Sequence, residues 1–326
     1  MRRRDVVKLL AGATLAAPLR AAAQSAKTYR LAMLTTGPAF PPQNPNVKIL
    51  LGALADKGYK LGQSLEFQSY GADGQLPRLA QLVRDIVASK VDAVVVVGWP
   101  PANAMKDAGL PTVVAVGAGD PVATGLVANL AHPGGNITGI SDNATTLSTK
   151  RLDLLKQAAP NIRNVAMLWN KEDLGMTLRY QSCADAAKSL GVSVLPLGVA
   201  EPNDFGDAFT IMDREKPDSI LMVADSLTVL NRKRVYDYAN ANRLPAFYEY
   251  EFFVRDGGLM SYGADFKESF EHAAALVDQI FKGAKAADLP FEEPTRYLFV
   301  INMKTAKAMN LTVPPTMLAL ADEVIE

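Results

Sequence analysis

The chain has 326 residues, 49% of them hydrophobic and 21% charged, which predicts about two globular domains and argues against a disordered, collagenous or coiled-coil chain. Lys and Arg total 34 and Asp and Glu total 34, so the basic excess of a nucleic-acid-binding protein is missing and no nucleic-acid partner is expected. With two His and the single Cys183, an intrachain disulfide is excluded, and neither a Cys/His zinc site nor another metal site is expected.

The N-terminus has the pattern of an export signal. Residues 1–23 combine a basic start, an apolar run shorter than the about 20 residues of a membrane helix, and an Ala-rich cleavage region. The consecutive Arg2, Arg3 and Arg4 indicate a twin-arginine signal, with an ordinary basic leader as the alternative. We expect cleavage after Ala23, and no Cys lies nearby to carry a lipid. The mature protein is therefore predicted to be periplasmic, exported, soluble and not lipid-anchored.

Short apolar runs alternate with helical patterns along the rest of the chain, which is typical of parallel strands covered on both faces by helices. Strands are predicted at 29–34, 64–70, 92–97, 111–116, 137–140, 164–169, 192–197, 218–223, 245–248, 258–262 and 297–301. Helices are predicted at 45–57, 74–90, 101–108, 144–159, 175–190, 203–215, 227–242 and 266–282.

A weak internal repeat divides this pattern into two halves. The stretch Leu31–Leu34 recurs as Val165–Leu168, and Asp92–Val97 recurs as Asp218–Val223, in the same order and at nearly constant spacing. Chance similarity among strands rich in Ala and Val is the alternative. The repeat favours an α/β protein of two Rossmann-like lobes, each with a parallel sheet.

Ligands of such sheets bind beyond the carboxyl ends of the strands, so the loops that follow the strands carry the candidate site. These loops are rich in hydroxyl, aromatic and carboxylate side chains and begin helices, whose N-termini favour anionic groups. Two facing sets of loops predict a ligand cleft between the lobes. The dinucleotide, phosphate-loop and nucleophile-elbow motifs are all missing from the sequence, so neither a cofactor nor catalysis is expected.

Several stretches together resemble the extracytoplasmic substrate-binding component of ABC transporters, in the group described as tryptophan/tyrosine-type. They follow the family's order over most of residues 28–326. The matching stretches are Asp120–Val122, Gly125–Val127, His132–Gly139, Asp256–Gly263, Lys282–Pro290, Val300–Lys307 and Leu311–Pro315.

The resemblance implies a type I periplasmic-binding fold, in which the chain crosses between the lobes three times. We place these crossovers near 142–144, 261–264 and 293–297. Lobe I would then comprise 28–142 plus 263–294, and lobe II would comprise 143–262 plus 295–326.

The resemblance also suggests roles for individual residues. Small polar groups of the family's first loop correspond to Thr35 and Thr36, and the Asp after a lobe II strand corresponds to Asp225. The family's Gly-Thr-Pro-Ala loop is changed here, so that Trp99 stands in place of a hydroxyl that holds a ligand carboxylate and offers an aromatic platform instead. The predicted ligand-binding residues are Thr35, Thr36, Phe40, Trp99, Asp120, Asn143, Asn170, Asp225, Ser226, Tyr248 and Tyr262.

Asp225 has two possible roles. Its carboxylate follows a predicted strand and could receive a ligand ammonium, or it could cap the helix predicted at 227–242. The aromatic residues Tyr248, Tyr250 and Phe252 could line the site or pack in the core.

The resemblance implies a binding protein without catalysis that captures a small ligand by closure of its lobes and delivers it to a cognate ABC permease. We expect a monomer whose ligand is an aromatic or branched-chain amino acid or a small aromatic carboxylate. A periplasmic sensor module and an exported enzyme on a related fold are the alternatives.

Overall fold

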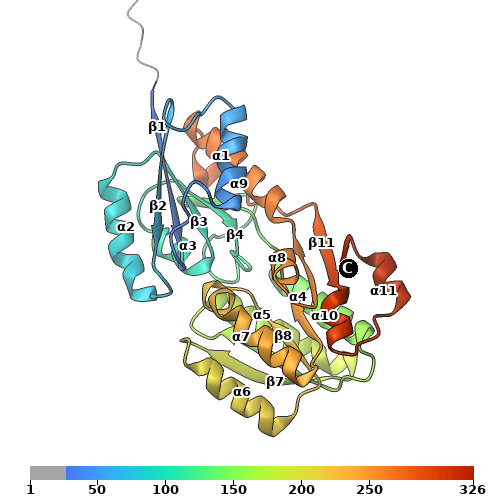
Figure 1. The fold of residues 1–326 in the computed structure, drawn as a ribbon. Helices are drawn as coiled ribbons and strands as arrows, with labels where there is room; N and C mark the ends of the chain where they lie inside the picture. Colours follow the sequence, from blue (N-terminus) through green and yellow to red (C-terminus); the bar gives the residue numbers. More distant parts are fainter. Residues whose placement is uncertain (1–26) are drawn as a thin grey trace, which may run out of the picture.

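The computed structural model describes residues 27–326, so the predicted signal peptide at 1–23 lies outside the described residues. The described chain forms two α/β lobes, which Figure 1 shows one above the other. This confirms the predicted fold class. Within residues 27–326, no helix combines the length and apolar composition needed to cross a membrane.

The first lobe is built on a five-stranded, wholly parallel sheet in the order β2-β1-β3-β4-β5. Its strands are β1 (Tyr29–Thr35), β2 (Leu65–Gly71), β3 (Ala93–Val97), β4 (Thr112–Val116) and β5 (Ile137–Gly139). Its helices are α1 (Pro45–Asp56), α2 (Leu79–Ala88), α3 (Trp99–Met105) and α9 (Phe266–Phe281), with 3₁₀ turns η1 (Leu76–Arg78) and η3 (Ala286–Asp288).

Both faces of this sheet are buried, which explains the continuous apolar runs in its strands. Leu31 and Met33 of β1 pack in the core beneath α1 and α9, whereas the alternate residues Ala32 and Leu34 pack in a second core beneath α2 and α3. Because successive side chains of a strand point to opposite faces, a strand covered on both sides needs apolar residues at every position.

The second lobe is built on a seven-stranded sheet in the order β12-β11-β10-β9-β8-β6-β7, in which only β10 and β11 pair antiparallel. Its strands are β6 (Asn164–Asn170), β7 (Ser193–Val199), β8 (Ser219–Met222), β9 (Ala246–Tyr248), β10 (Met260–Ala264), β11 (Tyr297–Asn302) and β12 (Glu323–Ile325). Its helices are α4 (Ala144–Ala158), α5 (Leu174–Ala187), α6 (Asp204–Glu215), α7 (Ser226–Asn242), α8 (Glu251–Arg255), α10 (Met303–Ala308) and α11 (Pro315–Leu320), with the 3₁₀ turn η2 (Lys188–Leu190).

The internal repeat of the sequence has a structural counterpart. Strands β2-β1-β3-β4 of the first sheet and β7-β6-β8-β9 of the second have the same order. The repeated aspartates also act alike: Asp92 accepts the N–H of Arg30 at the start of β1, and Asp218 accepts the N–H of Asn164 at the start of β6. Each aspartate thus ties the third strand of its lobe to the first.

The chain passes between the lobes three times. It does so between β5 and α4, between β10 and α9, and between η3 and β11. Strand β10 stays in the second sheet as far as Ala264, and α9 begins at Phe266 against the first sheet. The lobe boundaries inferred from the resemblance stay a prediction.

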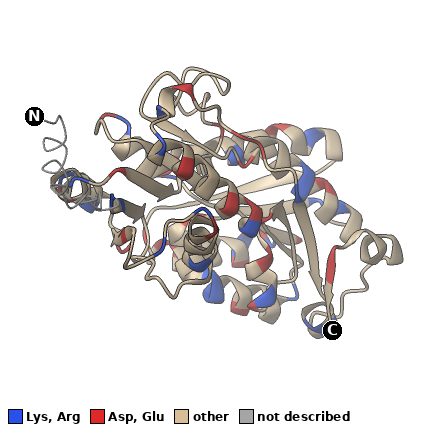
Figure 2. Ribbon diagram, turned by 90° about the horizontal axis from the view of Figure 1, so that it is seen from above, with Lys and Arg blue, Asp and Glu red and all other residues tan. Residues whose placement is uncertain are grey.

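Lys and Arg are interspersed with Asp and Glu along the described helices in Figure 2. In that view Lys and Arg do not gather on one side of the described chain, which agrees with the equal numbers of basic and acidic residues in the sequence.

Candidate functional site

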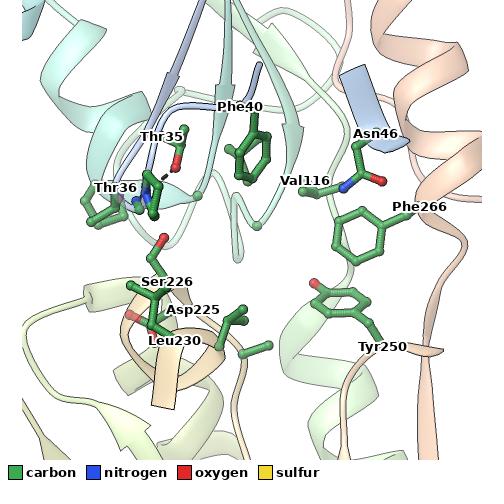
Figure 3. A pocket seen from close by; sticks show the side chains of 18 of the residues that line it. Thr35, Thr36, Phe40, Asn46, Val116, Asp225, Ser226, Leu230, Tyr250 and Phe266 are labelled. Carbon is green, nitrogen blue, oxygen red and sulfur yellow. Dashed lines mark hydrogen bonds between the residues drawn. The ribbon is translucent and has the colours of Figure 1, made fainter. Parts of the chain in front are cut away.

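A cavity of about 390 Å³ lies between the two lobes (Figure 3). The first lobe lines it with residues that follow β1, β3 and β4, and the second lobe lines it with the loop after β8 and the N-terminus of α5. These are carboxyl ends of parallel strands, where ligands of open α/β sheets bind.

The two lobes contact each other beside this cavity. A Cβ built on Gly119 of the first lobe would lie 3.2 Å from the Cα of Gly175 of the second. A Cβ on Gly37 would lie 3.4 Å from the Oγ of Ser226. At both places the two lobes approach each other closely, which is possible because glycine has no Cβ. The lobes are therefore in a closed arrangement.

Two carboxylates line the cavity from the second lobe, Asp173 and Asp225. Burial and, to a lesser extent, the nearby Asp225 carboxylate raise the pKa of Asp173 to about 7. Burial also raises the pKa of Asp225. Among the described residues that line this cavity, none is Lys, Arg or His. The cavity therefore offers two carboxyl groups that lack a basic partner among these lining residues.

Asp225 makes two kinds of contact. Its Oδ1 accepts the backbone N–H of Thr228 at 2.8 Å and completes a capping box at the start of α7. Its Oδ2 accepts the side-chain amide of Asn170 at 2.6 Å. The Asn170 Oδ1 in turn accepts the N–H of Glu172, which fixes the orientation of the amide. The predicted capping role of Asp225 is thus confirmed, and its carboxylate still borders the cavity.

Asp173 is held in a similar way. It is the N-cap of α5, its Oδ1 accepts the N–H of Met176 at 3.3 Å, and only 1% of the residue is exposed. An Asp cap at a helix start is stabilised by the unpaired N–H groups of the first turn. The cap therefore fixes a second acid at the wall of the cavity.

Hydroxyl groups line another part of the cavity wall. Thr35 ends β1 and Thr36 follows it, Ser226 begins α7 across the interlobe contact, and Figure 3 shows these side chains facing one another. The Thr35 Oγ1 accepts the N–H of Gly37, so its own hydrogen remains free for donation.

Aromatic rings form the remaining wall. Tyr250 lies 4.5 Å from Phe266, centroid to centroid, and 6.1 Å from Phe252. Phe40 enters from the first lobe (Figure 3). This side of the cavity is therefore mainly aromatic and apolar.

The structure brings five of the eleven predicted ligand-binding residues to the cavity: Thr35, Thr36, Phe40, Asp225 and Ser226. Asn170 lies behind Asp225 and supports it. The other five do not line the cavity.

Each of these five residues has a different setting. Trp99 is the first residue of α3 and lines an adjacent groove with residues of α2, while Asp120 caps a turn through Val122 and Ala123. Asn143 precedes α4 in the first crossover, and the ring of Tyr262 packs against Tyr297 and Phe299. Tyr248 is 1% exposed and packs between Tyr236 and Phe253 in the core.

We therefore expect Tyr248→Phe to leave ligand affinity unchanged within about twofold, because the ring belongs to the core and keeps its packing. Isothermal titration calorimetry of the variant checks this. A loss of affinity of tenfold or more would place the Tyr248 hydroxyl in the binding site instead.

Sequence reasoning missed Asp173, Asn44, Asn46, Met176 and Phe266 as lining residues. Asp173 had a usable signal, since an Asp directly before a helix at the carboxyl end of a strand caps that helix and faces the site. No group of three His, Cys, Asp or Glu side chains within residues 27–326 could hold a metal ion.

Three comparisons place this geometry among known proteins. The family model described as ABC transporter substrate binding protein matches residues 41–325. A relative named tyrosine-binding protein, from Clostridioides difficile strain R20291, is 28% identical over 268 residues, which cover 81% of this chain and 76% of the relative.

Two solved structures are similar over nearly the whole described chain. A conserved domain protein from Vibrio cholerae O1 biovar El Tor aligns with a TM-score of 0.85 and 26% identity, covering 91% of this chain and 100% of that chain. An ABC domain from Streptococcus pneumonia in complex with L-Trp aligns with a TM-score of 0.82 and 26% identity, covering 92% and 100%. The two lobes have the type I periplasmic-binding arrangement of such structures.

Proposed function

Because the chain belongs to the family of ABC transporter substrate-binding proteins, we propose that it captures a small solute between its lobes and delivers it to a cognate ABC permease. The family is one of substrate-binding proteins, and in this proposal the chain binds its ligand without a chemical reaction. A ligand that contacts both lobes only when they are closed shifts an open–closed equilibrium towards the closed arrangement.

The ligand in this proposal carries an ammonium group. The observation that supports it is the pair of cavity acids, Asp173 and Asp225, with no basic side chain among the described lining residues. An ammonium between two carboxylates gains charge-assisted hydrogen bonds and offsets the cost of their burial.

The rest of the cavity suits an amino acid. The hydroxyls of Thr35, Thr36 and Ser226 can donate to a ligand carboxylate, and the rings of Tyr250 and Phe266 can cover an apolar side chain. Of the predicted ligands, an aromatic or branched-chain amino acid is retained in this proposal. A small aromatic carboxylate is disfavoured, since it would add a third negative charge without an ammonium. The relatives described as binding tyrosine and L-Trp support the same class.

We further propose that the protein is exported, is processed near Ala23, remains without a lipid anchor and acts as a periplasmic monomer. The sequence pattern of residues 1–23 and the single, buried Cys183 support this part of the proposal. Mass spectrometry of the protein from its native host should show loss of about the first 23 residues, and a retained N-terminus or an added lipid would contradict it.

A thermal-shift screen tests the ligand class. At a ligand concentration of about 100 times Kd, binding stabilises the folded protein by about 2.7 kcal/mol, which raises Tm measurably. We expect a rise with aromatic or branched-chain amino acids and none with benzoate-like carboxylates, polyols or sugars. A rise only with sugars or polyols would overturn the assignment.

A further inference from the structure

Four charged side chains are buried together behind the ligand cavity. Asp142 is 3% exposed, and Arg151, Arg179 and Glu249 are each at most 1% exposed. Burial of so many charges costs several kcal/mol per ion unless they are paired with good geometry. The contacts of these side chains show what the cluster holds in place.

Glu249 is the centre of the cluster. Its Oε1 accepts from Arg151 Nη1 at 2.7 Å, and its Oε2 accepts from Arg179 Nη1 at 2.6 Å. The same Oε2 accepts the backbone N–H of Ala224 at 3.0 Å. Ala224 lines the ligand cavity and directly precedes Asp225. Glu249 therefore fixes the loop that carries one of the two cavity acids.

Asp142 connects the cluster to the first crossover. It lies between β5 of the first lobe and α4 of the second, and its Oδ2 accepts from Arg179 Nη2 at 2.5 Å. The same oxygen accepts from the hydroxyl of Tyr250 at 3.3 Å. Tyr250 lines the cavity, whereas Asp142 does not. Asp142 in the crossover is thus hydrogen-bonded to Tyr250 in the aromatic wall of the cavity.

The second crossover is tied to the same cluster. Arg151 Nε donates at 2.6 Å to the backbone carbonyl of Tyr262 in β10, shortly before the chain passes to α9. A Cβ built on the next residue, Gly263, would lie 2.0 Å from the carbonyl oxygen of Glu249, so the two backbones are in close contact.

The cluster also keeps two polar atoms unsatisfied. Within the described residues, Asp142 Oδ1 and Arg179 Nε are buried without a hydrogen-bond partner. Buried polar atoms without a partner are uncommon in native proteins, so these two atoms need an explanation. Arg179 is in addition close enough to Asp173 that its charge opposes the rise in the pKa of that acid.

We propose that the cluster of Asp142, Arg151, Arg179 and Glu249 couples rotation at the crossovers to the ligand site, with Asp142 and Arg179 as positioning residues. The inference rests on the proposed ligand-capture function. Opening of the lobes changes backbone angles in the crossovers, which moves Asp142 relative to Arg179 and Tyr250. The complete set of contacts then belongs to the closed arrangement and favours it.

Asp142→Asn tests the coupling, because it removes the charge while keeping the shape. We expect calorimetry with L-tyrosine to show affinity reduced about tenfold, although Asp142 does not line the ligand cavity. The matched control is Asp278→Asn in α9, a 6% exposed carboxylate that accepts from Tyr59 and Lys282 in the first lobe. The control should lower Tm and leave the affinity unchanged. An unchanged affinity in Asp142→Asn, with only a lower Tm, would overturn the proposal.

A second measurement does not depend on knowing the ligand. Spin labels at the exposed positions 107 and 201, one in each lobe, report the interlobe distance distribution of the ligand-free protein. We expect the fraction of molecules with the short, closed interlobe distance to fall in Asp142→Asn. The same decrease is expected in Tyr250→Phe, which replaces Asp142→Asn as the test if that variant does not fold. Distributions identical to that of the unsubstituted protein would overturn the coupling, whereas failure of every amino acid to bind would instead contradict the proposed function.

Discussion

Asp173→Asn is expected to weaken binding of an amino-acid ligand at least about tenfold at pH 8, or about 1.4 kcal/mol, measured by calorimetry. The Asn side chain can still cap α5, as Asp173 does through the N–H of Met176, but it carries no charge for a ligand ammonium. The matched control is Asp120→Asn, which also caps a turn but lies outside the cavity, and its affinity should stay unchanged.

The same substitution should stabilise the ligand-free protein at high pH. Because the pKa of Asp173 is about 7 in the fold and 3.8 in a model peptide, ionisation of this carboxyl destabilises the folded state. The penalty is absent below about pH 4, grows as the pH rises towards 7, and reaches about 4 kcal/mol above it. Urea unfolding at pH 4 and pH 8 should therefore show a gain for Asp173→Asn at pH 8 alone. A loss of stability at pH 8 would contradict the raised pKa of this buried acid.

Gly175→Val should weaken ligand binding about a hundredfold, measured by calorimetry. A Cβ at this position would lie 3.2 Å from Asp173 Oδ1 and 3.5 Å from Trp99 Cβ, and valine adds two methyl groups beyond it. The crowding against Trp99, which belongs to the first lobe, is relieved when the lobes separate, whereas the contact with Asp173 lies within the second lobe and is present in both arrangements. Because binding requires closure of the lobes, the steric clash with Trp99 lowers the ligand affinity.

Gly206→Val in α6 is the control for that variant, since a Cβ there meets nothing within 4 Å. Its affinity, measured by calorimetry, should equal that of the unsubstituted protein. Unweakened binding by Gly175→Val would show that the contact between Gly119 and Gly175 does not belong to the ligand-bound arrangement.

The strands were the most predictable part of the fold. All eleven predicted strands are present because buried parallel strands need apolar residues on both faces, as Leu31 and Ala32 illustrate. The short elements α8, α10, α11 and β12 were missed. Each has three to six residues, too few for a helical or alternating pattern to stand out from the neighbouring loop.

The site was predictable where a residue lies at or shortly after the carboxyl end of a strand, as with Thr35, Thr36 and Asp225. The direction of side chains in the turns was not. Helix α3 begins at Trp99, two residues before its predicted start, because Pro100 and Pro101 favour the first turn of a helix. Trp99 therefore lines the groove beside α2 and not the ligand cavity.

The central claim is that an ammonium group is recognised between Asp173 and Asp225. Calorimetric titration of the protein with L-tyrosine and with 3-(4-hydroxyphenyl)propanoate, which differs by the absence of the ammonium, tests it most directly. We expect the amino acid to bind at least about a hundredfold more tightly, a difference of about 2.7 kcal/mol. Equal affinities, or tighter binding of the deaminated acid, would contradict the account.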